Sequence, residues 1–231
     1  MALLEIEDVD TYYGDSRILQ DVSMEVGEDE IVAIIGRNGV GKTTVMRTVL
    51  QMTPPREGKV RFKGVDVTGA ETHEVAGMGM GWVPEDRRPF TQLTVEENIR
   101  ISVKGGDIDG KVEKAFERFP LLTDSRNSKA MKMSGGEQQM LALARGLVGD
   151  NDLLMVDEPS EGLSPKVAGD IMNALEDAAE DSSLLVIEQN LSVAFDLADR
   201  YYMLDNGEVV SQGETEGLDE DPEELMEHLR V

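Results

Sequence analysis

The chain has 231 residues, of which 40% are hydrophobic, and this is enough for a buried core. It contains no cysteine, which excludes disulfides and thiolate metal sites, and its two histidines, His73 and His228, are too few for a metal site built on several imidazoles. No apolar run approaches the ~20 residues needed to cross a bilayer, and no charged-then-apolar leader opens the sequence. We therefore expect any connection to a membrane to come through a partner protein.

The composition is strongly acidic. Aspartate and glutamate total 47 against 22 lysine and arginine residues, which gives a formal net charge of −25. Such a surface disfavours binding to nucleic acid or to anionic lipid, because both select basic proteins. The acidic residues are scattered along the chain and become dense at 219–224, and their simplest interpretation is a solvated surface without chemistry of its own.

The first part of the chain predicts strands. Hydrophobic alternation at 4–6 and again at 22–26 is typical of strands with one buried face. The continuous β-branched run Ile31–Ile35 predicts a strand buried on both faces, as in a parallel sheet. A helix is expected over 43–52, because two consecutive prolines follow it.

The last part alternates between strands and helices. Helices are expected over 165–180 and 191–199. The pair Asn206-Gly207 predicts a tight hairpin, since both residues tolerate positive φ. Further apolar runs of strand length lie at 80–83, 153–156, 184–187 and 201–204. The alternation predicts an α/β fold with a mostly parallel sheet, preceded by an antiparallel N-terminal β portion.

The middle of the chain has a different pattern. From 95 to 148 it is helical, with apolar residues such as Val95 and Ile99 four positions apart and no run typical of a buried strand. We interpret this region as a helical subdomain inserted into the α/β core. The predicted single domain, residues 1–231, then consists of a core at 1–84 and 151–231 and an inserted subdomain at 85–150.

A complete G-x-x-x-x-G-K-[ST] motif stands between an apolar strand and a helix, at 36–43, and we call this segment the phosphate loop. Its glycines let backbone N–H groups converge on phosphate oxygens, and the helix N-terminus adds a favourable dipole. Lys42 is expected to neutralise β- and γ-phosphate charge, and Thr43 to offer its hydroxyl to Mg²⁺. The residues expected to bind nucleotide here are Gly36, Asn38, Gly39, Val40, Gly41, Lys42, Thr43 and Thr44.

Two acidic residues follow the apolar run 153–156. A buried strand delivers the carboxylates of Asp157 and Glu158 to the carboxyl edge of the sheet, where ligands of such folds bind. Asp157 is expected to hold Mg²⁺, directly or through water, and Glu158 to orient and polarise an attacking water. On their own the two acids could equally be an ordinary helix cap, but the phosphate loop upstream favours the catalytic interpretation.

Residues 133–139, Met-Ser-Gly-Gly-Glu-Gln-Gln, resemble the signature motif of ABC ATPases, often LSGGQ. The serine hydroxyl and the glycine amides at a helix start form another anion site. In that family the site, here Ser134, Gly135, Gly136 and Glu137, faces the γ-phosphate bound by the other subunit, so that a complete active site needs two chains. Alternatively, Ser134 simply caps a helix over 135–148, and both roles are compatible because the same amides serve both.

Other segments resemble the same family in order. Tyr13 resembles the aromatic residue that stacks on adenine in that family, and Tyr12 is the second candidate for this role. Alternatively, the tyrosine only packs in the core. Residues 160–163 take the place of the D-loop, which lies along the dimer seam in that family. Glu85 stands where most members carry a glutamine, and Gln189 where most carry the switch histidine. Both substitutions resemble the ATP-binding proteins of branched-chain amino-acid importers; urea importers, which usually keep the glutamine, are the second choice.

These substitutions have chemical consequences. Glu85 can still ligate Mg²⁺ through oxygen, but it adds negative charge beside the phosphates. Gln189 can donate a hydrogen bond to the γ-phosphate, yet it cannot take a positive charge as histidine can. The metal ligands implied by the resemblance are Thr43, Glu85 and Asp157, and the catalytic residues are Glu158, Gln189 and Lys42.

The resemblance covers nearly the whole chain and implies an ABC ATPase that hydrolyses ATP with Mg²⁺ to drive a transporter. It implies three kinds of partner: membrane permease subunits, a separate solute-binding protein, and a second ATPase subunit, identical or homologous, in a head-to-tail dimer. No nucleic acid is expected, and the chain would lie at the cytoplasmic face of the cell membrane, attached through the permeases. Two other classes of protein are alternatives. A soluble ABC ATPase of DNA repair or translation usually carries coiled coils or fused ATPase units, and neither is present here. A small-molecule phosphotransferase is disfavoured by the signature motif.

We predict that the protein comes from a high-salt cytoplasm, because its abundant carboxylates repel one another unless salt screens them. The free energy of unfolding and the ATPase activity should both rise with potassium chloride concentration, as measured by chemical denaturation and by phosphate release. Full folding and activity in dilute buffer without salt would contradict this prediction.

Overall fold

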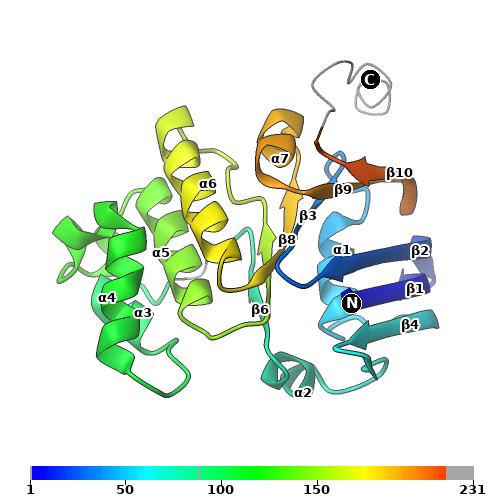
Figure 1. Cartoon of the computed structure of the whole chain (residues 1–231), viewed down its shortest axis with the longest axis horizontal. Coiled ribbons are helices and arrows are strands. Elements are labelled where there is room, and N and C mark those ends of the chain that lie inside the picture. Colours follow the sequence, from blue (N-terminus) through cyan, green and yellow to red (C-terminus); the bar gives the residue numbers. More distant parts are fainter. Residues whose placement is uncertain (1, 88, 217–231) are drawn as a thin grey trace.

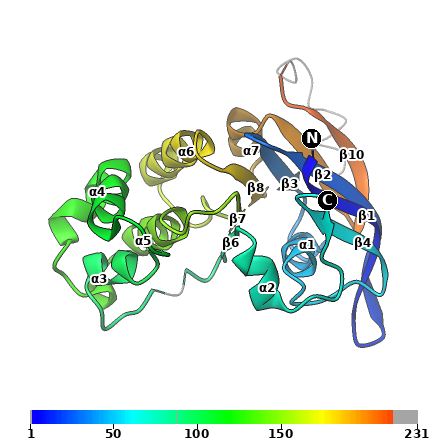
Figure 2. The same cartoon turned by 60° about the horizontal axis from the view of Figure 1, so that its bottom comes forward.

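The computed structural model describes residues 2–87 and 89–216. The acidic run at 219–224 and His228 lie outside the described residues. The described chain forms two sheets, and most of its helices lie on one side of the larger sheet while the smaller sheet lies on the other (Figure 1, Figure 2). The predicted α/β fold is confirmed.

The larger sheet is mostly parallel. Its strands are β3 (Ile31–Ile35), β6 (Met80–Val83), β7 (Leu153–Asp157), β8 (Ser183–Glu188), β9 (Arg200–Asp205) and β10 (Glu208–Glu214). They follow the order β10-β9-β3-β8-β7-β6, and only β10, at one edge, runs antiparallel to its neighbour. The predicted hairpin is confirmed, because Asn206 and Gly207 have φ values of 47° and 83° and join β9 to β10.

The smaller sheet is antiparallel and comes from the N-terminal part of the chain. Its strands are β1 (Ala2–Tyr13), β2 (Ser16–Gly27), β4 (Glu57–Phe62) and β5 (Val65–Asp66), in the order β2-β1-β4-β5. The residues whose alternation predicted strands lie opposite one another, Leu4 beside Val26 and Ile6 beside Met24, and all four are buried. The expected antiparallel β portion is therefore present, and the two strands are longer than the alternation indicated.

The inner strands of the larger sheet are buried on both faces. Alternate residues of β3 face opposite cores, Ala33 toward the helices and Ile34 toward the smaller sheet. Helix α1 (Lys42–Val49) packs in the second core, between the two sheets (Figure 1). Helices α6 (Pro165–Ala179) and α7 (Leu191–Leu197) cover the other face. This double cover explains why the strands read as continuous apolar runs.

Between β6 and β7 the chain is helical, as predicted. The helices are α3 (Val95–Arg100), α4 (Ile108–Arg118) and α5 (Gly135–Leu147), with 3-10 turns at Pro120–Ser125 and Ala130–Lys132. They fall inside the range 85–150, and the division into core and inserted subdomain stays a proposal. No helix in the described ranges is long and apolar enough to cross a membrane.

The predicted end of the first helix is wrong. The helix expected over 43–52 ends at Val49, because Gln51 takes a left-handed φ of 57°. The Thr48 carbonyl of the last turn accepts two hydrogen bonds from Gln51, one from its backbone N–H at 3.0 Å and one from its side-chain amide at 2.7 Å. Glutamine is not a usual helix terminator, so the sequence pattern did not reveal this end.

The helix expected over 191–199 also ends early, at Leu197. Asp199 instead accepts a hydrogen bond at Oδ2 from the Ile31 N–H, at 2.8 Å, and so fixes the start of β3. The segment 57–77, for which no element was predicted, forms β4, β5 and α2 (Thr72–Gly77). Its strands are short or mostly exposed on one face, so they lack a clear apolar period.

We predict that Gly207→Ala destabilises the protein through the junction of the two sheets. The Gly207 carbonyl accepts a hydrogen bond from the Gln20 N–H at 2.8 Å, and a Cβ at this glycine would overlap the Ile18 carbonyl oxygen. The substitution should lower the free energy of unfolding by about 2–4 kcal/mol, because backbone strain and a steric clash add. Urea denaturation measures the loss.

The matched control is Gly64→Ala in the β4–β5 turn. Gly64 has a similar φ of +73°, but a Cβ there would meet nothing within 4 Å, so only the conformational cost of about 1 kcal/mol is expected. Equal losses in the two variants would show that the close approach of the sheets at Gly207 carries no energy of its own.

Candidate active site

The phosphate loop leaves the carboxyl end of β3 and leads into α1. The Lys42 ammonium lies inside it, where Nζ donates to the carbonyl oxygens of Gly36 at 2.8 Å and Arg37 at 3.2 Å. The same ammonium forms an ion pair with Glu158 Oε1 at 3.1 Å, and the two side chains are only 4% and 10% exposed. All three N–H groups of Lys42 can therefore be satisfied, and little water screens the attraction to Glu158.

Glycine conformations shape the loop. Gly39 and Gly41 have φ values of 85° and 113°, which side-chain-bearing residues rarely adopt. A Cβ on Gly41 would lie 2.9 Å from a Leu19 methyl carbon, whereas a Cβ on Gly39 would meet nothing within 4 Å. The backbone around Gly39 thus borders open space, as a phosphate-binding turn requires. The other residues expected here, Gly36, Asn38, Val40, Thr43 and Thr44, lie on the same loop and the first turn of α1.

Asp157 ends β7 beside this loop. It is only 1% exposed, and its Oδ1 has no hydrogen-bond partner among the described residues. Burial raises the pKa of Asp157 to about 6; a hydrogen bond with Thr43 opposes this rise, whereas the charges of Glu158 and Glu85 add to it. A buried carboxylate oxygen without a donor, next to a threonine hydroxyl, is chemically suited to a Mg²⁺ ion. The residues present therefore fit the metal.

Further carboxylates gather around Glu158. The pKa of Glu161 is raised to about 6, first by a hydrogen bond with Glu158, then by burial and by the charges of Glu158 and Glu85. Glu158 itself has a φ of 47°, a left-handed conformation that is uncommon for a side-chain-bearing residue. The Glu161 N–H donates to the Glu158 carbonyl at 3.3 Å, and this bond keeps Glu161 close to Glu158. The sequence placed Glu161 in the segment 160–163, which resembles the D-loop, but assigned it no chemical role in the site.

Glu188 is a second residue that was not assigned. It ends β8, is only 2% exposed, and accepts a hydrogen bond at Oε1 from the Ser160 N–H at 3.1 Å. Burial raises the pKa of Glu188, and hydrogen bonds from Ser160 and Asn190 oppose this rise. Glu188 thereby fixes the loop that follows Glu158. The sequence signal that could have identified Glu188 is an acidic residue directly after the apolar run 184–187. Gln189, the next residue, is exposed at the same sheet edge.

The signature residues lie at the start of α5. Ser134 is the N-cap, Glu137 N donates to its Oγ at 3.4 Å, and the Glu137 carboxylate accepts from both Ser134 N and Ser134 Oγ at 2.7 Å. The capping interpretation is thus confirmed. Ser134 and Gly135 are exposed, and in the described part of the chain the hydrogen bonds of Ser134 do not reach the phosphate loop.

Tyr13 ends β1 close to α1. Its side chain is 42% exposed, and its hydroxyl accepts a hydrogen bond from Arg47 Nη1 at 3.2 Å. The Tyr12 ring is instead covered by the Arg56 guanidinium, whose Cζ lies 4.2 Å from the ring centroid. Of the two tyrosines, Tyr13 has the ring more accessible to a planar ligand.

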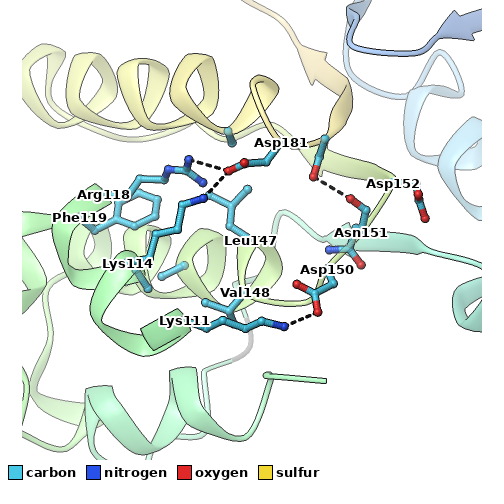
Figure 3. A pocket seen from close by; sticks show the side chains of 14 residues that line it. Lys111, Lys114, Arg118, Phe119, Leu147, Val148, Asp150, Asn151, Asp152 and Asp181 are labelled. Carbon is cyan, nitrogen blue, oxygen red and sulfur yellow. Dashed lines mark hydrogen bonds and ion pairs between the residues drawn. The ribbon is translucent and has the colours of Figure 1, made fainter. Parts of the chain in front are cut away.

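A separate cleft of about 430 Å³ lies at the opposite edge of the larger sheet (Figure 3). It is bordered by α4 and by the loops that precede β7 and β8, hence by the amino ends of these strands. Lys111 pairs with Asp150, while Lys114 and Arg118 lie 2.7 and 3.3 Å from an Asp181 carboxylate oxygen. Because these charges neutralise one another within the chain, we interpret the cleft as a packing seam.

Fold and site together define a class of protein. A parallel sheet with a phosphate loop after an inner strand, and an acidic strand end beside it, is typical of phosphate-loop ATPases. A serine-capped, glycine-rich helix start in helices inserted between β6 and β7 narrows this class to ABC-type ATPases.

Comparison with known proteins agrees with this class. Residues 19–161 match the family described as ABC transporter. The chain is 39% identical to a high-affinity branched-chain amino acid transport ATP-binding protein of Pseudomonas aeruginosa, over 90% of this chain and 91% of the relative. It is 34% identical to a probable branched-chain amino acid transport ATP-binding protein of Archaeoglobus fulgidus, over 94% and 91%.

Solved structures share the fold. An ATP-binding cassette of an ABC transporter superposes over 100% of both chains with a TM-score of 0.88 and 27% identity. A dimeric cassette bound to ADP and phosphate, 24% identical, has the same fold over 93% of this chain and 100% of its own, with a TM-score of 0.83. The chain belongs to the ABC transporter family, and it is an ATP-binding ATPase whose activity is coupled to transport.

We predict a pH-dependent stability contribution from Asp157. Because its pKa in the folded protein is about 6 rather than 3.8, the native state binds this proton more tightly than the unfolded chain. The contribution is therefore fully present below about pH 3.8 and is lost as the pH rises through about 6. Without Mg²⁺ and nucleotide, Asp157→Asn should gain about 2–3 kcal/mol over the wild type between about pH 4 and pH 7.5.

Denaturant unfolding at a series of pH values measures this difference. Asp15→Asn, which removes an exposed aspartate in the β1–β2 turn, controls for the loss of one negative charge. The prediction would be contradicted if the difference in unfolding free energy between Asp157→Asn and the wild type did not change with pH. It would also be contradicted if the difference between Asp15→Asn and the wild type changed with pH by the same amount.

Proposed function

We propose that this chain is the ATP-hydrolysing subunit of an importer for branched-chain amino acids. The observation that carries the proposal is the 39% identity, over 90% of the chain, to a protein named for that transport. The pair Glu85 and Gln189 adds support, because both residues resemble that subfamily, and Glu85 favours it over the urea importers.

We infer that the triphosphate of ATP binds along the phosphate loop and that adenine stacks on Tyr13. The loop supports this by its convergent backbone at Gly39 and Gly41, and the exposed Tyr13 ring offers a π face. Thr43, Asp157 and Glu85 would hold Mg²⁺, which supplies positive charge against the phosphates when bound.

Glu158 is the proposed general base. Its carboxylate accepts a proton from the attacking water as the water oxygen bonds to the γ-phosphorus and the bond to the β–γ bridging oxygen breaks, which yields ADP and phosphate. In the structure Glu158 is held by Lys42 at 3.1 Å. Because phosphate oxygens compete for the same ammonium, a bound triphosphate would release Glu158 toward the water. Gln189 would donate a hydrogen bond to the γ-phosphate.

A second ATPase subunit, identical or homologous, would complete each site in a head-to-tail dimer. The exposed residues at the start of α5 are available for this, with Ser134, Gly135, Gly136 and Glu137 facing the γ-phosphate held by the partner. A cassette of the same fold that was solved as a dimer with ADP and phosphate is compatible with this arrangement.

The remaining partners would be membrane permease subunits and a separate solute-binding protein. The permeases would hold this chain at the cytoplasmic face of the cell membrane. The permeases would contact a groove near 85–90. Phe90 in this segment is 49% exposed, and the Arg145 guanidinium lies 4.7 Å from its ring centroid, so that an aromatic surface is available there. Such an exposed aromatic side chain is typical of protein contact sites.

We predict that Glu158→Gln binds ATP but lowers kcat by about 100-fold or more, because a general base typically contributes that much. Binding is measured with a fluorescent ATP analogue and turnover by phosphate release. Glu180→Gln, which changes an exposed glutamate at the end of α6, is the control. A Glu158 variant with near wild-type turnover would exclude the proposed base.

The transported solute is tested in cells that lack the gene. Uptake of radiolabelled leucine should be lost in the deletion strain, restored by the wild-type chain and not restored by Glu158→Gln. Loss of urea uptake with intact leucine uptake would instead favour the alternative importer class.

A further inference from the structure

Arg87 lies in the turn after β6, and its backbone is strained. Its φ is 58°, in the left-handed region, and its N–H donates to the Pro84 carbonyl at 3.2 Å. A side-chain-bearing residue stays in this conformation only where its surroundings favour it over the relaxed alternatives.

The guanidinium of Arg87 contacts two other segments, the start of α5 and the loop after Glu158. Its Nε donates a hydrogen bond to Gln139 Oε1 at 2.8 Å, and Nη2 donates to the Glu161 carbonyl at 3.3 Å. A Cβ added to Gly135 would lie 2.9 Å from Nη1, so the absence of a side chain at Gly135 makes room for the guanidinium. One side chain thus joins the segment after β6 to the start of α5 and to the loop after Glu158.

The contact to α5 is firm. Gln139 is only 1% exposed, and among the described residues its Nε2 has no hydrogen-bond partner while its Oε1 accepts from Arg87 Nε, so loss of Arg87 would leave both polar ends of this buried amide without a partner. On the other side of the same helix turn, a Cβ on Gly136 would lie 3.0 Å from a Val167 methyl of α6. Rotation of the α5 start about its axis would break the first contact or compress the second.

We propose that Arg87 is a positioning residue of the ATPase. By binding Gln139 and the Glu161 carbonyl together, it fixes the orientation of the signature residues at the start of α5 relative to the loop that follows Glu158. The inference rests on the proposed dimer, in which Ser134 must reach a phosphate held by another subunit. Small errors in the placement of such a group have large effects on rate.

The chemistry of the contact favours arginine over lysine. The two acceptors, a side-chain amide oxygen and a backbone carbonyl, are reached by different nitrogens of one planar group. A lysine ammonium is a point donor on a flexible stem and cannot hold both acceptors in a fixed relation. Arg87→Lys should therefore keep the charge but not the function.

The experiment compares Arg87→Ala and Arg87→Lys with the wild type. Both variants should lower kcat by about 10- to 100-fold, while the affinity of the isolated chain for a fluorescent ATP analogue stays unchanged, because the phosphate loop is not touched. Arg118→Ala is the matched control. Arg118 also joins a helix of the inserted region to α6, through the Asp177 carbonyl at 2.9 Å, but near the end of α6 and not near its start, where Val167 faces Gly136. It should leave kcat at the wild-type value.

A second measurement reports orientation directly. The chain has no native cysteine, so spin labels at Lys132→Cys, before α5, and Lys59→Cys, in β4, give the distance distribution between the helical region and the core. The distribution should broaden in Arg87→Ala. Gln139→Met removes the acceptor of the Arg87 Nε hydrogen bond and should broaden the distribution and lower kcat as Arg87→Ala does. The double variant should lose no more activity than either single variant, because both changes remove the same contact.

Several outcomes would overturn the inference. These are an unchanged kcat in Arg87→Ala, full rescue by Arg87→Lys, an equal loss in Arg118→Ala, or an unchanged distance distribution. If Arg87→Ala fails to fold, Gln139→Met decides by the same measurements. Normal leucine uptake without this chain would contradict the proposed importer but not the role of Arg87, because the distance and turnover measurements use only the purified protein.

Discussion

The buried ion pair between Lys42 and Glu158 holds the active site together. It joins the phosphate loop after β3 to the acidic end of β7, two segments that are distant in the sequence. Burying two charges is costly unless further hydrogen bonds satisfy them, and here the carbonyls of Gly36 and Arg37 supply acceptors for the ammonium. The pair also keeps Lys42 near the place where a phosphate oxygen would bind.

The ion pair depends in turn on the way the larger sheet is covered. Its inner strands are buried on both faces, by α1 and the smaller sheet on one side and by α5, α6 and α7 on the other. Polar side chains of these strands can therefore reach a ligand only at the strand ends. Parallel pairing of β3, β8 and β7 brings the carboxyl ends to one edge, where Asp157, Glu158 and Glu188 gather.

This concentration of buried carboxylates explains why the pKa values of Asp157 and Glu161 are raised. Burial raises the pKa of Asp157, and the hydrogen bond with Glu158 raises that of Glu161. A bound cation would stabilise the ionised forms, so the same cluster that is electrostatically unfavourable in the isolated chain is suited to a metal-bound nucleotide. Arg87 and Glu188 act at the margin of this cluster, where each binds the backbone of the loop after Glu158.

Much of the fold was predictable because its signals are local. The β-branched run of β3, the Asn206-Gly207 turn and the capping pattern at Ser134 each depend on residues that are neighbours in the chain. The end of α1 at Val49 was not predictable, since it follows from the left-handed backbone of Gln51, and glutamine is not a usual helix terminator. Likewise, Asp199 lies beyond the end of α7 and accepts a hydrogen bond from the Ile31 N–H of β3. The periodicity of apolar residues gives no indication of such a long-range contact.

The amino-acid sequence by itself determined which groups we propose to carry the chemistry: the phosphate loop, the acids at the end of β7 and the signature residues at the start of α5. Short-range spacing encodes these motifs, because each works through the backbone geometry of a few consecutive residues. Only the tertiary structure decided that Lys42 pairs with Glu158, that Glu161 and Glu188 belong to the site, and that Arg87 spans three segments. These are contacts between distant parts of the chain, and they exist only after the sheet has brought its strand ends together.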